Sequence, residues 1–149
     1  MKPHRKPLLM LLLCLITAVG YSQADTRPKI FENFPESIVI SDAKLQNLFQ
    51  SVDGQDINLA VSSSFNFPGR VLSNVAKYNN LQSITIKSEI FNNAILHLSR
   101  IKNDDGSISF VGRILNEHSF DGYEIVRNLD GTYIFKKFET GKVMQDCSF

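Results

Sequence analysis

The spacing of hydrophobic residues along the chain changes near residue 53. Before that point, apolar residues recur at the i, i+3, i+4, i+7 spacing of one helix face, at Leu45, Leu48, Phe49 and Val52. Ser41 is suited to accept a hydrogen bond from the backbone N–H groups of a first helical turn. Asp53-Gly54 is a typical stop signal. The pattern therefore predicts one N-terminal helix over residues 41–52.

After residue 54, apolar and polar residues alternate with the period of two that is typical of strands. The predicted strands cover residues 57–61, 67–72, 83–87, 95–101, 108–115, 123–127 and 132–138. Asp130-Gly131 between the last two strands is a strong hairpin signal. Because no second helix is available for parallel crossovers, we predict a mainly β fold, borderline α+β. The strands should form an antiparallel meander of about seven strands, as a curled sheet or small barrel.

Two segments of the predicted sheet resemble each other. FPGRVL (67–72) and FVGRIL (110–115) share F-x-G-R-[V/I]-L at a spacing of 43 residues, and each lies between two other predicted strands. This match indicates two copies of a three-stranded unit. Gly69 and Gly112 predict bulges or kinks that help the sheet to curl, and Pro68 predicts an edge or a bulge.

The first 24 residues have the pattern of a secretory signal peptide. Lys2, Arg5 and Lys6 form a basic start, the apolar run Leu8–Val19 follows, and small residues precede Asp25. The apolar run is shorter than the roughly 20 residues that span a membrane. We therefore expect a signal peptide at 1–24 and one mainly β domain at 25–149 that begins with an arm, residues 25–35. A cleaved signal predicts a periplasmic or secreted protein, with no lipid anchor and no remaining membrane span.

Charge and cysteine content limit the partners of the mature chain. The full chain has 16 Lys and Arg residues and 15 Asp and Glu residues, so removal of the signal peptide leaves 13 basic against 15 acidic residues. With no basic cluster left, no nucleic-acid partner is expected. Cys14 lies in the predicted signal peptide, so Cys147 would be the single cysteine, either a free thiol near the C-terminus or a link to another chain.

The segment ILNEHSFDGYEI, residues 114–125, gathers most of the residues that could do chemistry. Glu117 and His118 could supply a general base, with Asp121 orienting the imidazole. The alternative interpretation, which we favour, is a connecting turn between two strands, because turns concentrate polar residues. The 116–124 loop is therefore only a weak candidate for a catalytic site.

Two further sets of residues are candidates for binding. Arg70 and Arg113 occupy equivalent places in the repeated segment and could grip a carboxylate or phosphate, although pairing with acids on neighbouring strands is the simpler explanation. His97 and His118 are the only histidines of the mature chain, and no cysteine cluster accompanies them. Their spacing is not that of metal ligands, so we expect no metal and no other cofactor.

These observations favour an exported, small, non-catalytic binding or interaction domain, whose ligand is an unknown protein or small molecule. One helix before an antiparallel meander resembles the lipocalin-like small barrels, which is a likeness of fold and fixes no function. Two alternatives remain open. The first is a small exported hydrolase or isomerase that uses the 116–124 loop, and the second is a structural envelope module that associates through sheet edges.

Overall fold

The structure, a computed structural model, describes residues 26–141. The predicted signal peptide and Cys147 lie outside the described residues. The described residues form eight strands and one helix: β1 Ser37–Ile40, α2 Asp42–Leu48, β2 Asp56–Ala60, β3 Asn66–Tyr78, β4 Leu81–Ser88, β5 Ala94–Lys102, β6 Ile108–Leu115, β7 Asp121–Arg127 and β8 Tyr133–Glu139.

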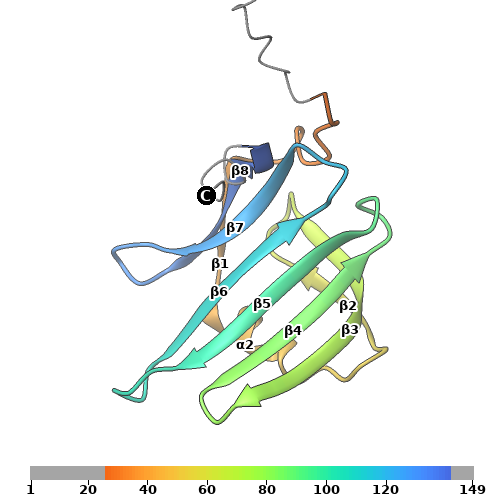
Figure 1. The fold of residues 1–149 in the computed structure, drawn as a ribbon. Coiled ribbons are helices and arrows are strands. Elements are labelled where there is room, and N and C mark those ends of the chain that lie inside the picture. The colour runs from red at the N-terminus through yellow and green to blue at the C-terminus, as the bar shows by residue number, and fades with distance from the viewer. Residues whose placement is uncertain (1–25, 142–149) are drawn as a thin grey trace, which may run out of the picture.

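All eight strands belong to one antiparallel sheet with the order β1-β8-β7-β6-β5-β4-β3-β2. The sheet curls into a half-barrel, and both ends of the described chain leave it at the same end of the barrel (Figure 1). Helix α2 connects the two edge strands, β1 and β2. The prediction of a mainly β, curled antiparallel meander is therefore confirmed.

The eighth strand, β1, was not predicted. It pairs with β8 through the register Ile38↔Phe135 and Ile40↔Tyr133, and the two isoleucines are buried. Its alternation extends over four residues only, and its partner strand lies almost a hundred residues later. A strand this short is recognisable only when its partner is known. Because β1 covers β8, the edges of the sheet are β1 and β2.

The helix begins as predicted and ends earlier. Ser41 is the N-cap, and its Oγ accepts a hydrogen bond from the backbone N–H of Lys44 at 3.4 Å. After Leu48 the hydrogen bonds tighten to the i→i+3 type, for example from Gln50 N to Asn47 O at 3.1 Å. The prediction that Val52 belongs to the buried face was wrong, since its side chain is 67% exposed.

The two copies of the repeated segment lie in β3 and β6. Each lies between the strands that precede and follow it in the chain, but the two differ in how they pair with the following strand. Strand β3 continues to Tyr78 and shifts register against β4 twice, after Val71 and after Ala76. Strand β6 pairs with β7 over three residues only, from Gly112 to Ile114. The two segments thus occupy similar places in the meander with different neighbours.

Gly69 and Gly112 allow the neighbouring strand to approach closely, because a side chain at either position would collide with its backbone. A Cβ atom on Gly69 would lie 2.7 Å from Lys87 O, and one on Gly112 would lie 2.5 Å from His97 O. The expected bulge in β3 falls beyond Gly69, between Val71 and Ser73. Pro68 is tolerated because the β3–β4 pairing begins only at Arg70↔Lys87, so no strand on that side needs its missing N–H.

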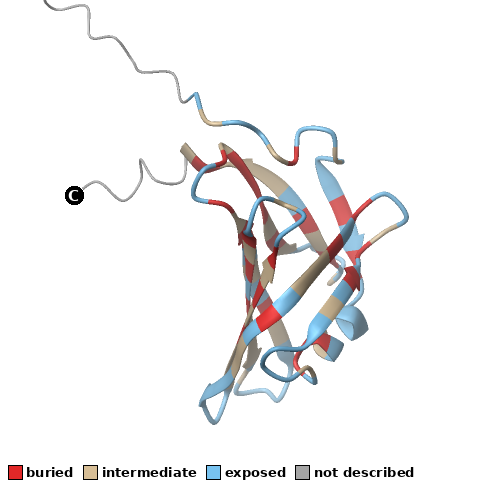
Figure 2. Cartoon of the chain, turned by 90° about the vertical axis from the view of Figure 1, so that its right-hand side faces the viewer, coloured by how far each residue is buried: buried red, intermediate tan, exposed pale blue. Residues whose placement is uncertain are grey.

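The concave side of the half-barrel is filled by side chains, many of them aromatic. Buried residues lie along the strands, whereas the hairpin tips are exposed (Figure 2). The arm residue Phe31 is fully buried and contacts the rings of Phe34, Phe65, Phe91 and Tyr123 at centroid distances of 5.2–6.3 Å. The arm is therefore packed on the core through Phe31.

Two hairpins share one turn sequence, N-x-D-G-[S/T], at residues 103–107 and 128–132. In both, the aspartate side chain accepts hydrogen bonds from the backbone N–H and the hydroxyl of the last residue, at 2.6–2.9 Å. Gly106 and Gly131 have φ of 81° and 87°, which other residues rarely adopt. These donors hold the pKa of Asp105 and of Asp130 below its usual range.

Candidate functional site

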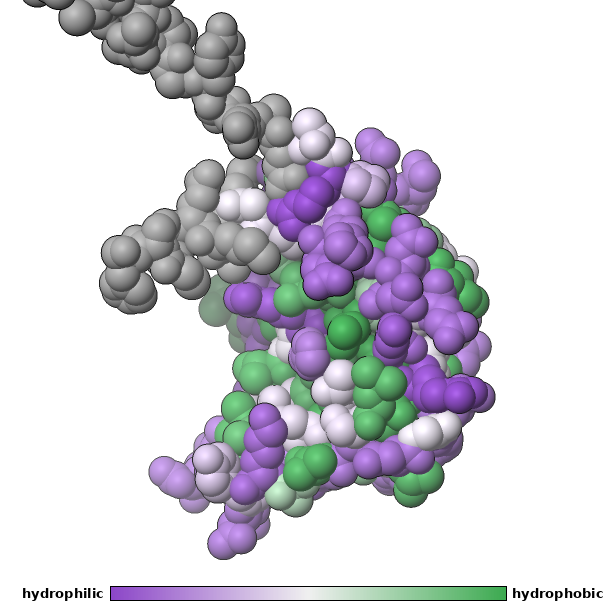
Figure 3. All heavy atoms as spheres, turned by 45° about the vertical axis from the view of Figure 1, so that its right-hand side comes forward, coloured by the Kyte–Doolittle hydropathy of each residue, from purple (hydrophilic) through white to green (hydrophobic). Residues whose placement is uncertain are grey.

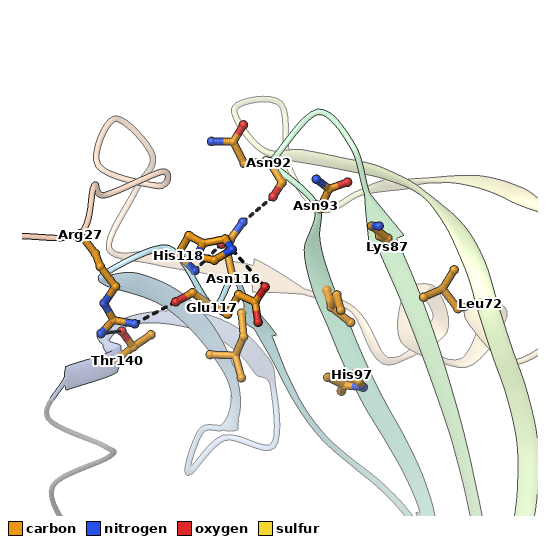
Figure 4. A pocket seen from close by; sticks show the side chains of 12 residues that line it. Arg27, Leu72, Lys87, Asn92, Asn93, His97, Asn116, Glu117, His118 and Thr140 are labelled. Carbon is orange, nitrogen blue, oxygen red and sulfur yellow. Dashed lines mark hydrogen bonds and ion pairs between the residues drawn. The ribbon is translucent and has the colours of Figure 1, made fainter.

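A groove of about 580 Å³ lies on the outer, convex face of the sheet (Figure 4). This volume is within the range of ligand-binding clefts. The groove is lined by Arg27, Leu72, Lys87, Asn92, Asn93, Ile95, His97, Leu115, Asn116, Glu117, His118 and Thr140. Segments from both ends of the described chain therefore meet around one surface feature.

The floor of the groove is a row of outward-facing residues on four neighbouring strands. Lys87, Ile95 and Leu115 are direct cross-strand partners on β4, β5 and β6. Leu72 extends this row onto β3, where the register shift lies, and its side chain is 49% exposed. In the space-filling view from this side, green apolar side chains lie among purple polar ones (Figure 3). The floor is mostly apolar and holds one lysine.

One wall of the groove consists of two loops that are tied together. Asn116, only 7% exposed, donates from Nδ2 to Asn92 O at 2.6 Å, and its Oδ1 accepts from His118 N at 2.8 Å. Asn92 and Asn93 have φ of 51° and 66°. Asparagine tolerates this left-handed region better than most residues. Asn116 thus positions both the 116–119 turn and the β4–β5 loop.

The N-terminal arm and the end of β8 support the same wall. Arg27 donates to Glu117 O at 3.2 Å and to Thr140 Oγ1 at 3.1 Å. Thr140 Oγ1 in turn donates to Ser119 O at 3.0 Å. The loop is therefore held by contacts that are 21 to 90 residues apart in sequence.

Glu117 and His118 lie together at the rim of the groove. Glu117 Oε1 is 3.0 Å from His118 Nε2, and the two side chains are 85% and 84% exposed. Ion pairs at such exposure contribute little to stability, because water competes for both partners. The sequence correctly indicated a turn at this place, and the structure adds that the turn borders a groove.

Asp121 lies apart from the Glu117–His118 pair. Its carboxylate is 1% exposed, and it accepts hydrogen bonds from Ile30 N at 2.9 Å, Phe31 N at 3.0 Å and Ser119 Oγ at 2.7 Å. The sequence suggested that Asp121 could orient the His118 imidazole. In the structure its carboxylate binds the arm and Ser119 instead. The carboxylate anchors the arm, because the two arm N–H groups have no strand partner and need an acceptor.

Neighbouring contacts reinforce this anchor. The Tyr123 hydroxyl donates to Pro35 O at 2.5 Å, and burial, with a smaller contribution from Glu36 and Asp121, raises the pKa of that hydroxyl well above its usual value. Lys137 Nζ donates to Phe34 O at 2.7 Å. The arm is therefore held by hydrogen bonds as well as by aromatic packing.

The structure separates Arg70 and Arg113, with two strands between them. Arg70 donates to both carboxylate oxygens of Asp56 at 2.8 and 3.1 Å, which holds the pKa of Asp56 below its usual range and raises that of Arg70. Arg113 lies 4.0 Å from Glu124 and over the ring of Phe138. Each arginine thus contacts an acid on the neighbouring strand, and the pair forms no joint anion site.

His97 faces outward from β5, opposite to the buried Leu96 and Leu98, and its Nδ1 is 3.2 Å from Thr85 Oγ1. It lines the same groove as His118, but from strand β5 and not from the 116–119 turn. Sequence spacing could not indicate this proximity, because it depends on the sheet register. No group of three or more His, Cys, Asp and Glu residues in the described chain is arranged to hold a metal ion.

Comparisons with known proteins add no identification. No protein-family model matches the chain, and comparisons with curated proteins and with solved structures found no match. Within residues 26–141, no helix has the length and apolar character needed to cross a membrane. The chemistry of the groove itself is therefore the basis for a functional proposal.

Proposed function

We propose that this protein is an exported binding domain without a catalytic role and that its ligand binds in the groove over β3–β6. The observation that carries this proposal is the groove itself, with an apolar floor and polar rim whose walls are hydrogen-bonded together. Apolar floors with a few placed polar groups are typical of ligand sites. The proposal that the protein is exported rests on the basic start and the apolar run within residues 1–24.

The concave interior is a less suitable place for a ligand. Phe31, Phe65, Phe67 and Phe135 are at most 1% exposed and occupy it together with the other core residues. A ligand carrier of the barrel type would need this space. The outer groove provides space without any rearrangement of the core.

Backbone-resolved NMR of the purified protein, titrated with a library of small polar, apolar, acidic and basic compounds, tests the proposal. We expect the largest shift changes at the amides of residues 72, 87, 95–97 and 115–118. A Leu115→Arg variant, which puts a long charged side chain on the groove floor, should abolish them. Val75→Arg is the matched control, since Val75 is an exposed valine on β3 that does not line the groove. Shift changes confined to the arm or core, or no binding at all, would overturn the proposal.

A catalytic use of Glu117 and His118 is a second proposal, and its supporting observation is the 3.0 Å contact between their side chains at the groove rim. A carboxylate that polarises an imidazole is one route to general-base catalysis. Hydrolysis of p-nitrophenyl acetate above the rate in buffer, lost in His118→Ala, would support it. Equal rates for the variant and the wild type would remove it.

Association through sheet edges has weaker support. The edge strand β1 has four residues, which limits the backbone available to a partner. On the other edge, Lys44 Nζ donates to Ala60 O at 2.6 Å and to Val61 O at 3.2 Å, which occupies carbonyl groups at the end of β2. Sedimentation of the concentrated protein as a strict monomer would exclude association of this kind.

A further inference from the structure

The charges around the groove indicate what kind of ligand it accepts. Its lining includes two permanently basic side chains, Arg27 and Lys87, and two histidines, but a single carboxylate, Glu117. That carboxylate already contacts His118 at 3.0 Å. A cationic ligand would therefore find no free acid in the groove lining, whereas an anionic ligand would meet a positive field.

Lys87 is the cation best placed to contact a ligand. Within the described part of the chain, its ammonium group makes no hydrogen bond or ion pair, and it projects from the floor between Leu72 and Ile95. Arg27, in contrast, is already bound to Glu117 O and Thr140 Oγ1. An ammonium group beside an apolar surface binds an anion more strongly than one in open water, because less solvent competes.

The longer apolar part of the floor lies on the β5–β6 side of Lys87. Ile95 and Leu115 follow it directly in the cross-strand row, and adjacent strands lie roughly 4.8 Å apart, so the row from Lys87 to Leu115 measures about 10 Å. The row ends at Leu115, which directly precedes the wall residue Asn116. A ligand that fits has a charged head at Lys87 and an apolar chain along this row.

We propose that the groove binds a free carboxylate with an extended apolar chain, of the fatty-acid type, with the carboxylate at Lys87 and the chain over Ile95 and Leu115. This inference depends on the proposed function, since it names the ligand class of the same groove. The carboxylate forms a charge-assisted hydrogen bond with the ammonium group, and the chain removes apolar surface of the floor from water.

Calorimetric titration with monomeric dodecanoate, below the concentration at which it forms micelles, tests the inference. Dodecyltrimethylammonium and dodecanol are the probes of the same chain length without the negative charge. We expect dodecanoate to bind at least tenfold more tightly than the ammonium compound. Lys87→Gln should weaken dodecanoate binding roughly fivefold or more, which corresponds to one charge-assisted hydrogen bond. Leu115→Asn should weaken all chain-bearing probes alike.

Lys77→Gln is the matched control, because Lys77 is an exposed lysine of β3 that does not line the groove. Its affinity for dodecanoate should equal that of the wild type, and urea unfolding of each variant verifies that the fold is retained. Equal affinity for dodecanoate and dodecyltrimethylammonium, or an unchanged affinity in Lys87→Gln, would overturn the inference.

Two further outcomes separate this inference from the proposal it depends on. If the compound library shifts the groove amides but no carboxylate does, the ligand class is wrong and the groove remains the binding site. If no compound affects the groove, both are wrong. Binding to phosphatidylcholine vesicles that contain dodecanoate, without binding of the free acid, would also overturn the inference, because it would make the membrane surface the ligand.

Discussion

Two acidic residues that lie four positions apart, Glu117 in the 116–119 turn and Asp121 at the start of β7, have different roles. The Glu117 side chain is 85% exposed and borders the groove next to His118, whereas Asp121 is 1% exposed and binds the backbone of the arm. In the sequence they form one polar cluster. The comparison shows that clustering of polar residues in a loop does not by itself define a site, because each side chain can serve a different neighbour.

The difference between the two acids is a matter of burial and of the partners that each one holds. A buried carboxylate that satisfies several N–H and O–H donors cannot be removed without leaving those donors unpaired. Removal of an exposed carboxylate leaves unpaired only groups that water can reach. Substitutions across the loop should therefore divide sharply into stability effects and binding effects.

The largest effect is expected from Asp121→Ala. The change leaves Phe31 N without its acceptor, and it removes the shorter hydrogen bonds of Ile30 N and Ser119 Oγ. Ile30 N then keeps only the 3.4 Å contact with Ser119 Oγ, and Ser119 Oγ keeps the bond to Pro28 O. Each buried donor left unpaired costs about 1–3 kcal/mol. We expect the free energy of unfolding in urea to fall by about 3 kcal/mol or more. Glu117→Ala, in the turn before β7, is the control. Equal losses of stability in the two variants would contradict the view that Asp121 anchors the arm whereas Glu117 only borders the groove.

Asn116→Ala should have an intermediate effect. It removes the hydrogen bonds to Asn92 O and from His118 N, which join the two loops of the wall. We expect a loss of about 1–2 kcal/mol in the free energy of unfolding, since two hydrogen bonds of a nearly buried side chain disappear. Amide hydrogen exchange should also become faster at residues 91–93 and 116–119. Unchanged exchange there would show that Asn116 does not hold the wall.

A pH experiment with Asp130 isolates a third kind of acid, one that is exposed but bound by fixed donors. Its pKa is lowered by the hydrogen bonds from Thr132 N and Thr132 Oγ1. A lowered folded-state pKa stabilises the fold above the unfolded-state value, and this contribution disappears as the pH falls through the folded-state pKa. The stability difference between wild type and Asp130→Asn should thus be larger at pH 6 than at pH 2.5. A difference independent of pH would contradict the assignment.

The smallest effect on stability is expected from His118→Ala. The side chain is 84% exposed, and its ion pair with Glu117 is open to water. We expect the urea unfolding free energy to change by no more than about 0.5 kcal/mol. A loss comparable to that of Asn116→Ala would mean that the rim supports the fold as well as bordering the groove.

Much of the fold could be predicted because its elements depend on local patterns. The strand at 108–115 was predicted with its observed bounds, because apolar and polar residues alternate along it. The Asp130-Gly131 hairpin follows from a turn that requires a positive φ at the glycine. The prediction was wrong for Val52 because the end of a helix depends on what its last turn packs against.

The candidate site was only partly accessible from the sequence. Glu117 and His118 were recognised as a pair because they are adjacent in the chain, and they do contact each other. The groove floor could not be recognised, because the alignment of Lys87, Ile95 and Leu115 is a property of strand register. The anchoring role of Asp121 was equally hidden, since its partners lie about 90 residues earlier.

The sequence by itself determined the class of fold, the place of the helix start, the alternating faces of the strands and the turns, because these depend on residues within a few positions of each other. Only the tertiary structure decided which polar residue is buried, which strands lie at the edges and which side chains share the groove. These features depend on contacts between segments far apart in the chain. Such contacts exist only after the sheet has curled and the arm has docked.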